Sequence, residues 1–180
     1  NNPPATTQPS NAQKVELTHL RLAAGPVEDV RITGFSVVAL GTGIDPADIG
    51  TVTVYRDANG NGIFDAGTDT GLAAATGPAF TVDNGTRTFA GLNLVIPKGG
   101  AEQWLAVYDF SGTGAAGATF QARVDAATIA AVGVTSGTAL AVGGFVSVTG
   151  GIVTLAAPGS AGSLSILTGA QNPGSQTITP

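Results

Sequence analysis

The chain has 180 residues, of which 43% are hydrophobic and 11% charged, and its formal net charge is −5. This balance excludes a disordered chain, which would need high charge and few aliphatic side chains. Seven basic residues are too few for the basic surface that nucleic-acid binding requires, so we expect no nucleic-acid partner. The absence of Cys and Met also excludes disulfides and zinc–thiolate sites.

The chain is long enough to bury one core, and its ends differ in composition from its middle. Residues 1–13 are polar and Pro-rich and are expected to form an extended leader. We expect a single β-sandwich domain over 14–168 and an extended tail over 169–180. No apolar run approaches the roughly 20 residues of a membrane helix, so no membrane span is expected.

Alternating apolar segments separated by turn residues predict an all-β fold. The alternation slips near His19 within 14–23 and changes face at Gly34 within 30–40, and both changes indicate β-bulges or kinks. Further strands are predicted, in chain order, at 51–56, 80–82, 89–96, 103–110, 120–124, 129–134, 139–148, 152–156 and 163–167. About ten short strands with turn signals between them are typical of an antiparallel β-sandwich, Ig-like or jelly-roll-like.

Two connections carry a local structural signal. Asp45 is placed to cap a short helical turn at 46–48. Asn84 and Gly85 separate the predicted strands 80–82 and 89–96, and Asn-Gly favours a type I′ hairpin turn because both residues tolerate positive φ.

The strongest motif is a candidate calcium loop between the strand at 51–56 and residue 69. Its first six residues, 57–62 (Asp-Ala-Asn-Gly-Asn-Gly), match the calcium pattern D-x-[DN]-x-[DN]-G. Ca²⁺ prefers hard oxygen ligands, and alternate positions of such a loop direct them inward. The candidate ligands are Asp57, Asn59, Asn61, Ile63 through its carbonyl, Asp65 and Asp69.

The loop departs from the EF-hand, because Thr68 stands where a ligating Glu is expected and strands flank the loop. Asp69, one residue later, can replace that acidic ligand. The alternative is a metal-free hairpin, since Asn-Gly pairs form turns without a cation. Three carboxylates and two amides within residues 57–69 would repel one another without a cation, so the sequence favours a structural Ca²⁺.

Other polar residues give weaker signals. Asn84, Gly85 and Thr86 form an N-glycosylation sequon, and we note Asn84 as a candidate glycan site, although the turn alone explains Asn-Gly. His19 is the single histidine and has no implied Ser or Cys partner, so a structural role is expected. We predict that the protein is not an enzyme and name no catalytic residue.

The aromatic residues Tyr55, Trp104 and Tyr108 allow two interpretations. They form either a sugar-stacking platform or part of the core, and the apolar character of both faces of 103–110 favours the core.

Two runs carry a resemblance to known proteins: 52–65 (Val-Thr-Val-Tyr-Arg-Asp-Ala-Asn-Gly-Asn-Gly-Ile-Phe-Asp) and 92–97 (Leu-Asn-Leu-Val-Ile-Pro). Together they resemble the β-sandwich modules with EF-hand-like calcium loops of bacterial and archaeal surface proteins, over roughly 14–134. More distantly, the architecture is similar to donor-strand fibre proteins, namely biofilm-matrix fibres and archaeal bundling pili. The resemblance implies an extracellular, cell-surface location and assembly in which a terminal strand completes the next subunit.

The head and tail of the chain resemble each other. Both 2–9 and 172–180 begin with Asn-Pro and continue with Thr and Pro, which indicates either a repeating unit or a polymer, unless composition alone explains it. We expect a structural subunit of an extracellular, pilus-like filament, a homopolymer joined by strand addition, with 12–23 as first donor candidate and the C-terminal strand as second. The alternatives are a module of a tandem adhesin or surface-layer protein, and a carbohydrate-binding module of a secreted enzyme.

Overall fold

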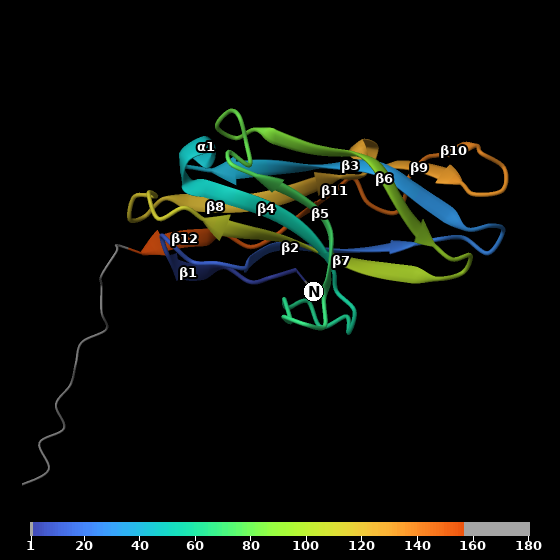
Figure 1. The fold of residues 1–180 in the computed structure, drawn as a ribbon, viewed down its shortest axis with the longest axis horizontal. Helices are drawn as coiled ribbons and strands as arrows, with labels where there is room; N and C mark the ends of the chain where they lie inside the picture. The colour runs from blue at the N-terminus through green and yellow to red at the C-terminus, as the bar shows by residue number, and fades with distance from the viewer. Residues whose placement is uncertain (1, 157–180) are drawn as a thin grey trace, which may run out of the picture.

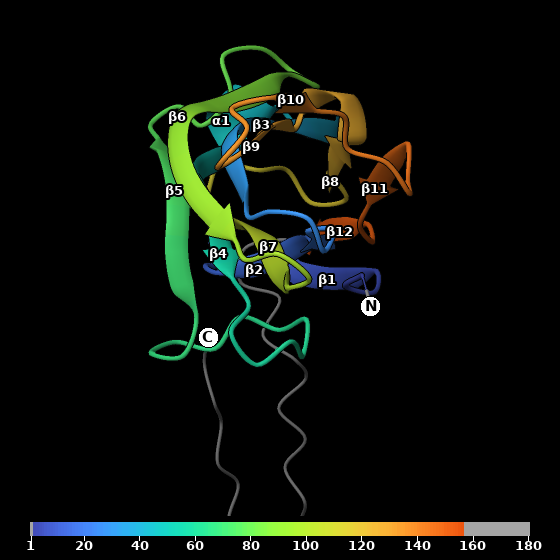
Figure 2. The ribbon, with the colours of Figure 1, turned by 90° about the vertical axis from the view of Figure 1, so that its right-hand side faces the viewer.

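The computed structural model describes residues 2–156, which form two β-sheets around a common apolar core (Figure 1, Figure 2). The eight-stranded sheet contains β1 (Thr6–Pro9), β3 (Val30–Gly41), β6 (Thr86–Ile96), β8 (Thr119–Asp125), β9 (Ala130–Gly133), β10 (Ala139–Leu140), β11 (Ser147–Thr149) and β12 (Val153–Ala156). The four-stranded sheet contains β2 (Val15–Ala23), β4 (Ile49–Arg56), β5 (Thr70–Thr76) and β7 (Ala101–Phe110). The prediction of an all-β sandwich is confirmed, with twelve described strands in place of about ten.

The strand order leaves several strands paired on one side only. β3 pairs with β6 along one side and with β9 and then β8 along the other, and β8 continues to β11 and β12. The smaller sheet has the order β2-β7-β4-β5, so β2 and β5 are its edges. Every pairing is antiparallel except that of β1 with β12, which is parallel. The antiparallel prediction therefore fails at this one rim of the sandwich.

The core lies between the sheets and is centred on β7, which β2 and β4 flank. Trp104 and Tyr108 are 1% and 0% exposed, and their rings pack against Phe35 and Phe80 at centroid distances of 5.3 and 5.8 Å. The prediction of a central, doubly apolar strand is confirmed. Because these two rings are buried, they do not form a sugar-stacking platform with Tyr55.

The two predicted irregularities are confirmed by the pairing registers. The register of β2 against β7 shifts between Glu16 and Thr18, and the register of β3 shifts between Ile32 and Gly34. At Gly34 a Cβ would overlap the Phe89 carbonyl oxygen, so the close approach of β6 requires glycine there.

Two strand predictions are wrong, and the strands β1 and β5 lie where none was predicted. The segment 139–148 divides into β10 and β11, because Gly144 takes a φ of 90° that a continuous strand does not allow. β5 was not expected, since its Ala-rich sequence alternates weakly. The segment 80–82 is a loop, because Phe80 turns into the core instead of extending a strand. The predicted strand 163–167 and the predicted tail lie outside the described residues.

The loop before β6 also corrects the prediction of a type I′ turn. Asn84 has a φ of 50°, but Gly85 does not take the second positive φ that this turn needs. Tertiary contacts determine the conformation instead, because Asn84 Oδ1 accepts the Gly41 N–H at 2.9 Å and its own N–H donates to Asp45 Oδ2 at 2.7 Å.

The short helix α1 (Asp45–Asp48) is confirmed with a different cap. Ile44 is the N-cap residue, and Asp48 Oδ2 accepts its N–H at 2.9 Å, so Asp45 lies inside the first turn. A 3₁₀ turn, η1 (Ala126–Thr128), joins β8 to β9. Within residues 2–156, no helix is long and apolar enough to cross a membrane.

Candidate metal-binding loop

The candidate calcium loop connects β4 to β5, and Asp57 anchors its beginning. The Asp57 N–H donates to the Gln103 carbonyl of β7 at 2.8 Å, which continues the sheet into the loop. Its side chain is fully buried, and its two carboxylate oxygens accept the N–H groups of Gly60 at 2.7 Å and Gly62 at 2.8 Å. Both glycines have positive φ, so the chain can fold tightly around this carboxylate.

The side chains of Asn59, Asn61 and Asp65 converge at the exposed side of the loop. The amide nitrogens of Asn59 and Asn61 donate to the same oxygen, Asp65 Oδ2, at 2.8 and 2.7 Å. These two hydrogen bonds stabilise the ionised carboxylate and lower the pKa of Asp65 below its ordinary value. The negative charge of Asp65 is therefore compensated by N–H groups in this arrangement.

Asp69 closes the loop from its far end. Its two carboxylate oxygens accept the N–H of Ala58 at 3.0 Å and of Asp65 at 2.8 Å. The N–H of Asp69 returns to the Asp65 carbonyl at 2.9 Å. Asp69 thus joins the two strands of the hairpin and orients Asp65.

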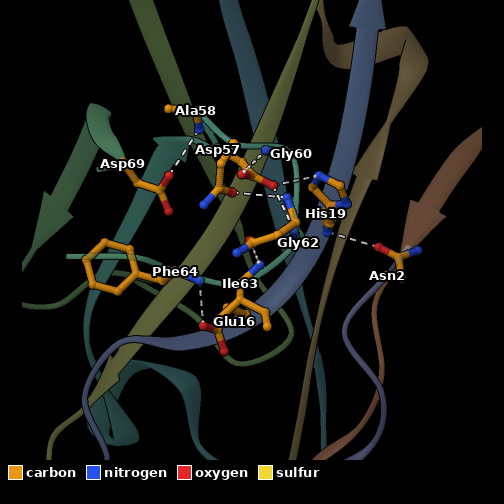
Figure 3. A network of polar contacts seen from close by, with 12 residues as sticks. Asn2, Glu16, His19, Asp57, Ala58, Gly60, Gly62, Ile63, Phe64 and Asp69 are labelled. Atoms are coloured by element: carbon orange, nitrogen blue, oxygen red, sulfur yellow. Dashed lines mark hydrogen bonds and ion pairs between the residues drawn. The ribbon is translucent and has the colours of Figure 1, made fainter. Parts of the chain in front are cut away.

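Two side chains of β2 and one of the N-terminal segment extend this network, as Figure 3 shows. Glu16 Oε1 accepts the Phe64 N–H at 2.8 Å, and His19 Nε2 lies 3.3 Å from Asp57 Oδ2. The His19 N–H in turn donates to Asn2 Oδ1 at 2.9 Å. No local pattern in the sequence indicates these contacts, because the pairing of β2 with β7 brings Glu16 and His19 to the loop, and Asn2 reaches only the His19 main chain.

The residue types of the loop fit a calcium ion, but its binding would require side chains to move, since the oxygens of Asp57 and Asp69 accept backbone N–H groups. Three carboxylates and two amides supply hard oxygens, and three of these five side chains already converge at Asp65 Oδ2. The amide nitrogens of Asn59 and Asn61 face that oxygen. For a Ca²⁺ ion to bind beside Asp65, both amides would have to turn so that their Oδ1 atoms face the ion. Among residues 2–156, no three acidic or histidine side chains lie close enough together to hold a metal, so the amide oxygens would be necessary ligands.

Two further candidate residues do not join the group of side chains at Asp65. Ile63 is exposed at the loop tip, whereas Asn84 is exposed on the loop before β6. The Asn84 amide nitrogen, where a glycan would attach, donates to Asp83 Oδ2 at 3.3 Å. A glycan at Asn84 remains a prediction.

The sequence matches no family model, and the search of curated proteins found no significant match.

Proposed function

We propose that the protein is a structural, non-catalytic subunit of an extracellular cell-surface filament, in which copies join by adding a strand to a neighbour's sheet. The observation that carries this proposal is the pairing of β1. This short strand near the N-terminus adds itself to the rim of the larger sheet, beside β12, in the parallel direction (Figure 2). The rim therefore accepts a short terminal strand, and the same bonds can form between two chains.

The attachment of β1 is one-sided. Within residues 2–156, β1 pairs with β12 alone, and its side chains are alternately half-buried and exposed. The Thr6 N–H of β1 donates to the Ile152 carbonyl at 2.9 Å. Just before β1, the Pro3 carbonyl accepts the Gly151 N–H at 3.0 Å. By contrast β2, in the first donor candidate 12–23, contributes the buried Leu17 and Leu20 to its own core. Exchange of β1 between chains would disturb the core less than exchange of β2, which favours β1 as the exchanged strand.

The edge strands β5 and β6 carry few charges, and each contains a register shift. β5 has no charged residue, and β6 has only Arg87. Monomeric β-proteins generally protect exposed edges with charges, prolines or bulges, because an open edge pairs with another chain. The scarcity of charge leaves the register shifts as the main protection of these two edges.

A bound Ca²⁺ would fit this setting as a structural element. The loop is held to β2 through Glu16 and His19, so an ion in the loop would stiffen the hairpin and the strand together. Asp57, Asp65 and Asp69 with Asn59 and Asn61 would hold it, and the ion would supply charge compensation.

The filament proposal is tested by electron microscopy and light scattering of the full chain over a range of concentrations. We expect filaments from the natural sequence and their loss in Thr6→Pro, because proline removes the N–H that bonds Ile152. Thr7→Pro is the matched control, since alternate residues of a strand point their N–H groups away from the partner. A natural chain that stays monomeric at every concentration contradicts the proposal.

The calcium proposal is tested by thermal unfolding with Ca²⁺ and with chelator. An ion that binds only the folded state at 100 times its Kd stabilises by about 2.7 kcal/mol, roughly 5–10 °C for a chain of this size. Asp65→Ala should abolish this shift, so that the variant unfolds at the same temperature with Ca²⁺ and with chelator. Asp29→Ala, outside the loop, should keep the shift. Equal melting of the natural chain in both conditions contradicts the proposal.

A further inference from the structure

An apolar groove of about 420 Å³ lies between the two sheets, at the end of the molecule where β2 leads into β3. Its lining includes the core residues Leu22, Ile32, Ile96 and Ala131, so the groove opens directly onto the core. β9 and β10 border it on one side and β2 on the other, as their positions in Figure 2 show. The loop 141–146 lies along the groove, and a second apolar hollow of about 450 Å³ lies on that loop's other side.

The edge of β2 beside this groove has main-chain groups without a partner strand among the described residues. The His19 N–H points away from β7, since it donates to Asn2, and Ala24 points toward β7, since its N–H donates to the Gly100 carbonyl. Along a strand, successive residues direct their N–H and C=O groups to opposite sides. Arg21 and Ala23 therefore point theirs to the same side as His19, away from β7. Neither residue makes a main-chain bond beyond the ladder with β7 within the described part of the chain.

An unpaired strand edge beside an apolar groove fits one kind of partner. The added segment must be an extended strand, because only a strand satisfies a row of N–H and C=O groups. One face of that strand must be apolar to fill the groove. The opposite face must be polar, because it remains in water.

One segment of this chain has that pattern and is not part of the described sheets. Residues 163–167 read Ser-Leu-Ser-Ile-Leu, so Leu164 and Ile166 fall on one face of a strand and the two serines fall on the other, followed there by Leu167 at the end of the segment. No charged residue occurs anywhere in 157–180, so burying this segment requires no charge to be desolvated.

The register of the larger sheet indicates which copy supplies this segment. Val153 pairs with Phe120, and Phe120 pairs with Gly41. Gly41 lies nine residues along β3 from Ile32, which lines the groove. Val153 is level with Gly41, and β12 continues from there for three more residues, away from the groove, to Ala156. At about 3.3 Å per residue, Ala156 lies roughly 40 Å from the groove. The eight residues from Ala156 to Leu164 span at most about 29 Å, and the ten to Ile166 at most about 36 Å, so both fall short of the groove of the same chain.

We propose that residues 163–167 of one copy add to the free edge of β2 in a second copy, with Leu164 and Ile166 filling the groove. This inference rests on the proposed function and specifies its second contact. The β1 rim and the β2 groove lie at opposite ends of the molecule, so each copy would engage a neighbour at each end.

The natural chain has no Cys, so engineered thiols test this contact without background. The experiment combines Ala23→Cys, at the exposed edge of β2, with Ser165→Cys in the full chain and treats it with a short bismaleimide. We expect a ladder of covalent multimers on a denaturing gel. Thr81→Cys with Ser165→Cys is the control, because Thr81 is exposed and does not line the groove. This control should give no ladder.

A second pair of variants tests the apolar face of the added strand. Ile166→Asp in the Cys pair should abolish the ladder, whereas Ser163→Asp on the polar face should preserve it. No cross-link, or a cross-link within single chains, overturns the inference. Filaments without a ladder would leave the filament proposal standing and remove this contact. Cross-linked pairs of chains without filaments would support this contact and contradict the filament proposal.

Discussion

At the scale of single residues, Asp45 is the least favourable charge in the described fold. It is 2% exposed, and burial is the main cause that raises its pKa from 3.8 to about 6. The Asn84 N–H partly opposes this shift, and the negative charges of Asp83 and Asp48 add to it. The nearby Tyr108 phenol is fully buried, and its pKa is raised by burial first and by the Asp45 charge second.

The raised pKa of Asp45 predicts that stability falls as the pH rises from about 4 to about 7. Below the unfolded pKa of 3.8 both states are protonated, and above the folded pKa of about 6 both are ionised. Between these values only the unfolded state has lost its proton, so the folded state loses up to about 3 kcal/mol, at 1.36 kcal/mol per pKa unit.

Asp45→Asn tests this prediction, because Asn keeps an acceptor for the Asn84 N–H and carries no charge. Chemical unfolding should show the variant more stable than the natural chain at pH 7 by up to about 3 kcal/mol and similar to it near pH 4. Asp29→Asn, at a half-buried carboxylate that accepts one backbone N–H, controls for the loss of a charge. An equal effect of Asp45→Asn at both pH values would be inconsistent with this account.

At the scale of elements, the approach of the β11–β12 turn to β2 is the tightest contact between the sheets. The buried Thr18 hydroxyl donates to the Ala122 carbonyl of β8, and Gly150 donates to the same carbonyl at 3.1 Å. A Cβ at Gly150 would overlap the Leu17 carbonyl oxygen of β2. The two sheets can approach at this point only because residue 150 has no side chain.

Gly150→Ala should therefore destabilise the fold by about 1–3 kcal/mol, the usual cost of overpacking, since backbone atoms of β2 must move. Gly143→Ala is the matched control, because a Cβ there meets nothing within 4 Å and its φ is not positive. Urea unfolding of the two variants measures the difference. Equal stability would show that the contact at Gly150 relaxes without cost.

Local sequence signals predicted those elements whose conformation local chemistry decides. The bulges in β2 and β3 followed from slips in apolar alternation, and the helix followed from the residues around Pro46. The turn at Asn84 failed, because contacts with Gly41 and Asp45 outweigh the Asn-Gly preference. The strand at 80–82 failed for a similar reason, since burying the Phe80 ring against Tyr108 gains more than extending a short edge strand.

At the scale of the candidate site, the sequence named the residues within the loop but not those around it. Asp57, Asn59, Asn61, Asp65 and Asp69 were all recognisable, because their spacing is local. Their contacts with one another and with Gly60 and Gly62 follow from that spacing. Glu16, His19 and Asn2 approach the loop from distant parts of the chain, and no spacing rule predicts such contacts.

At the scale of the whole molecule, the sequence by itself determined the fold class and one core centred on 103–110. Alternation and burial preference are properties of short segments, and each segment expresses them wherever it packs. Only the tertiary structure decided the strand order, the parallel pairing of β1, the edges left open and the groove beside β2. These features depend on which distant strands pair with one another. Many alternative strand pairings would bury a similar apolar area, so the packing and hydrogen bonds of the whole chain together select one arrangement.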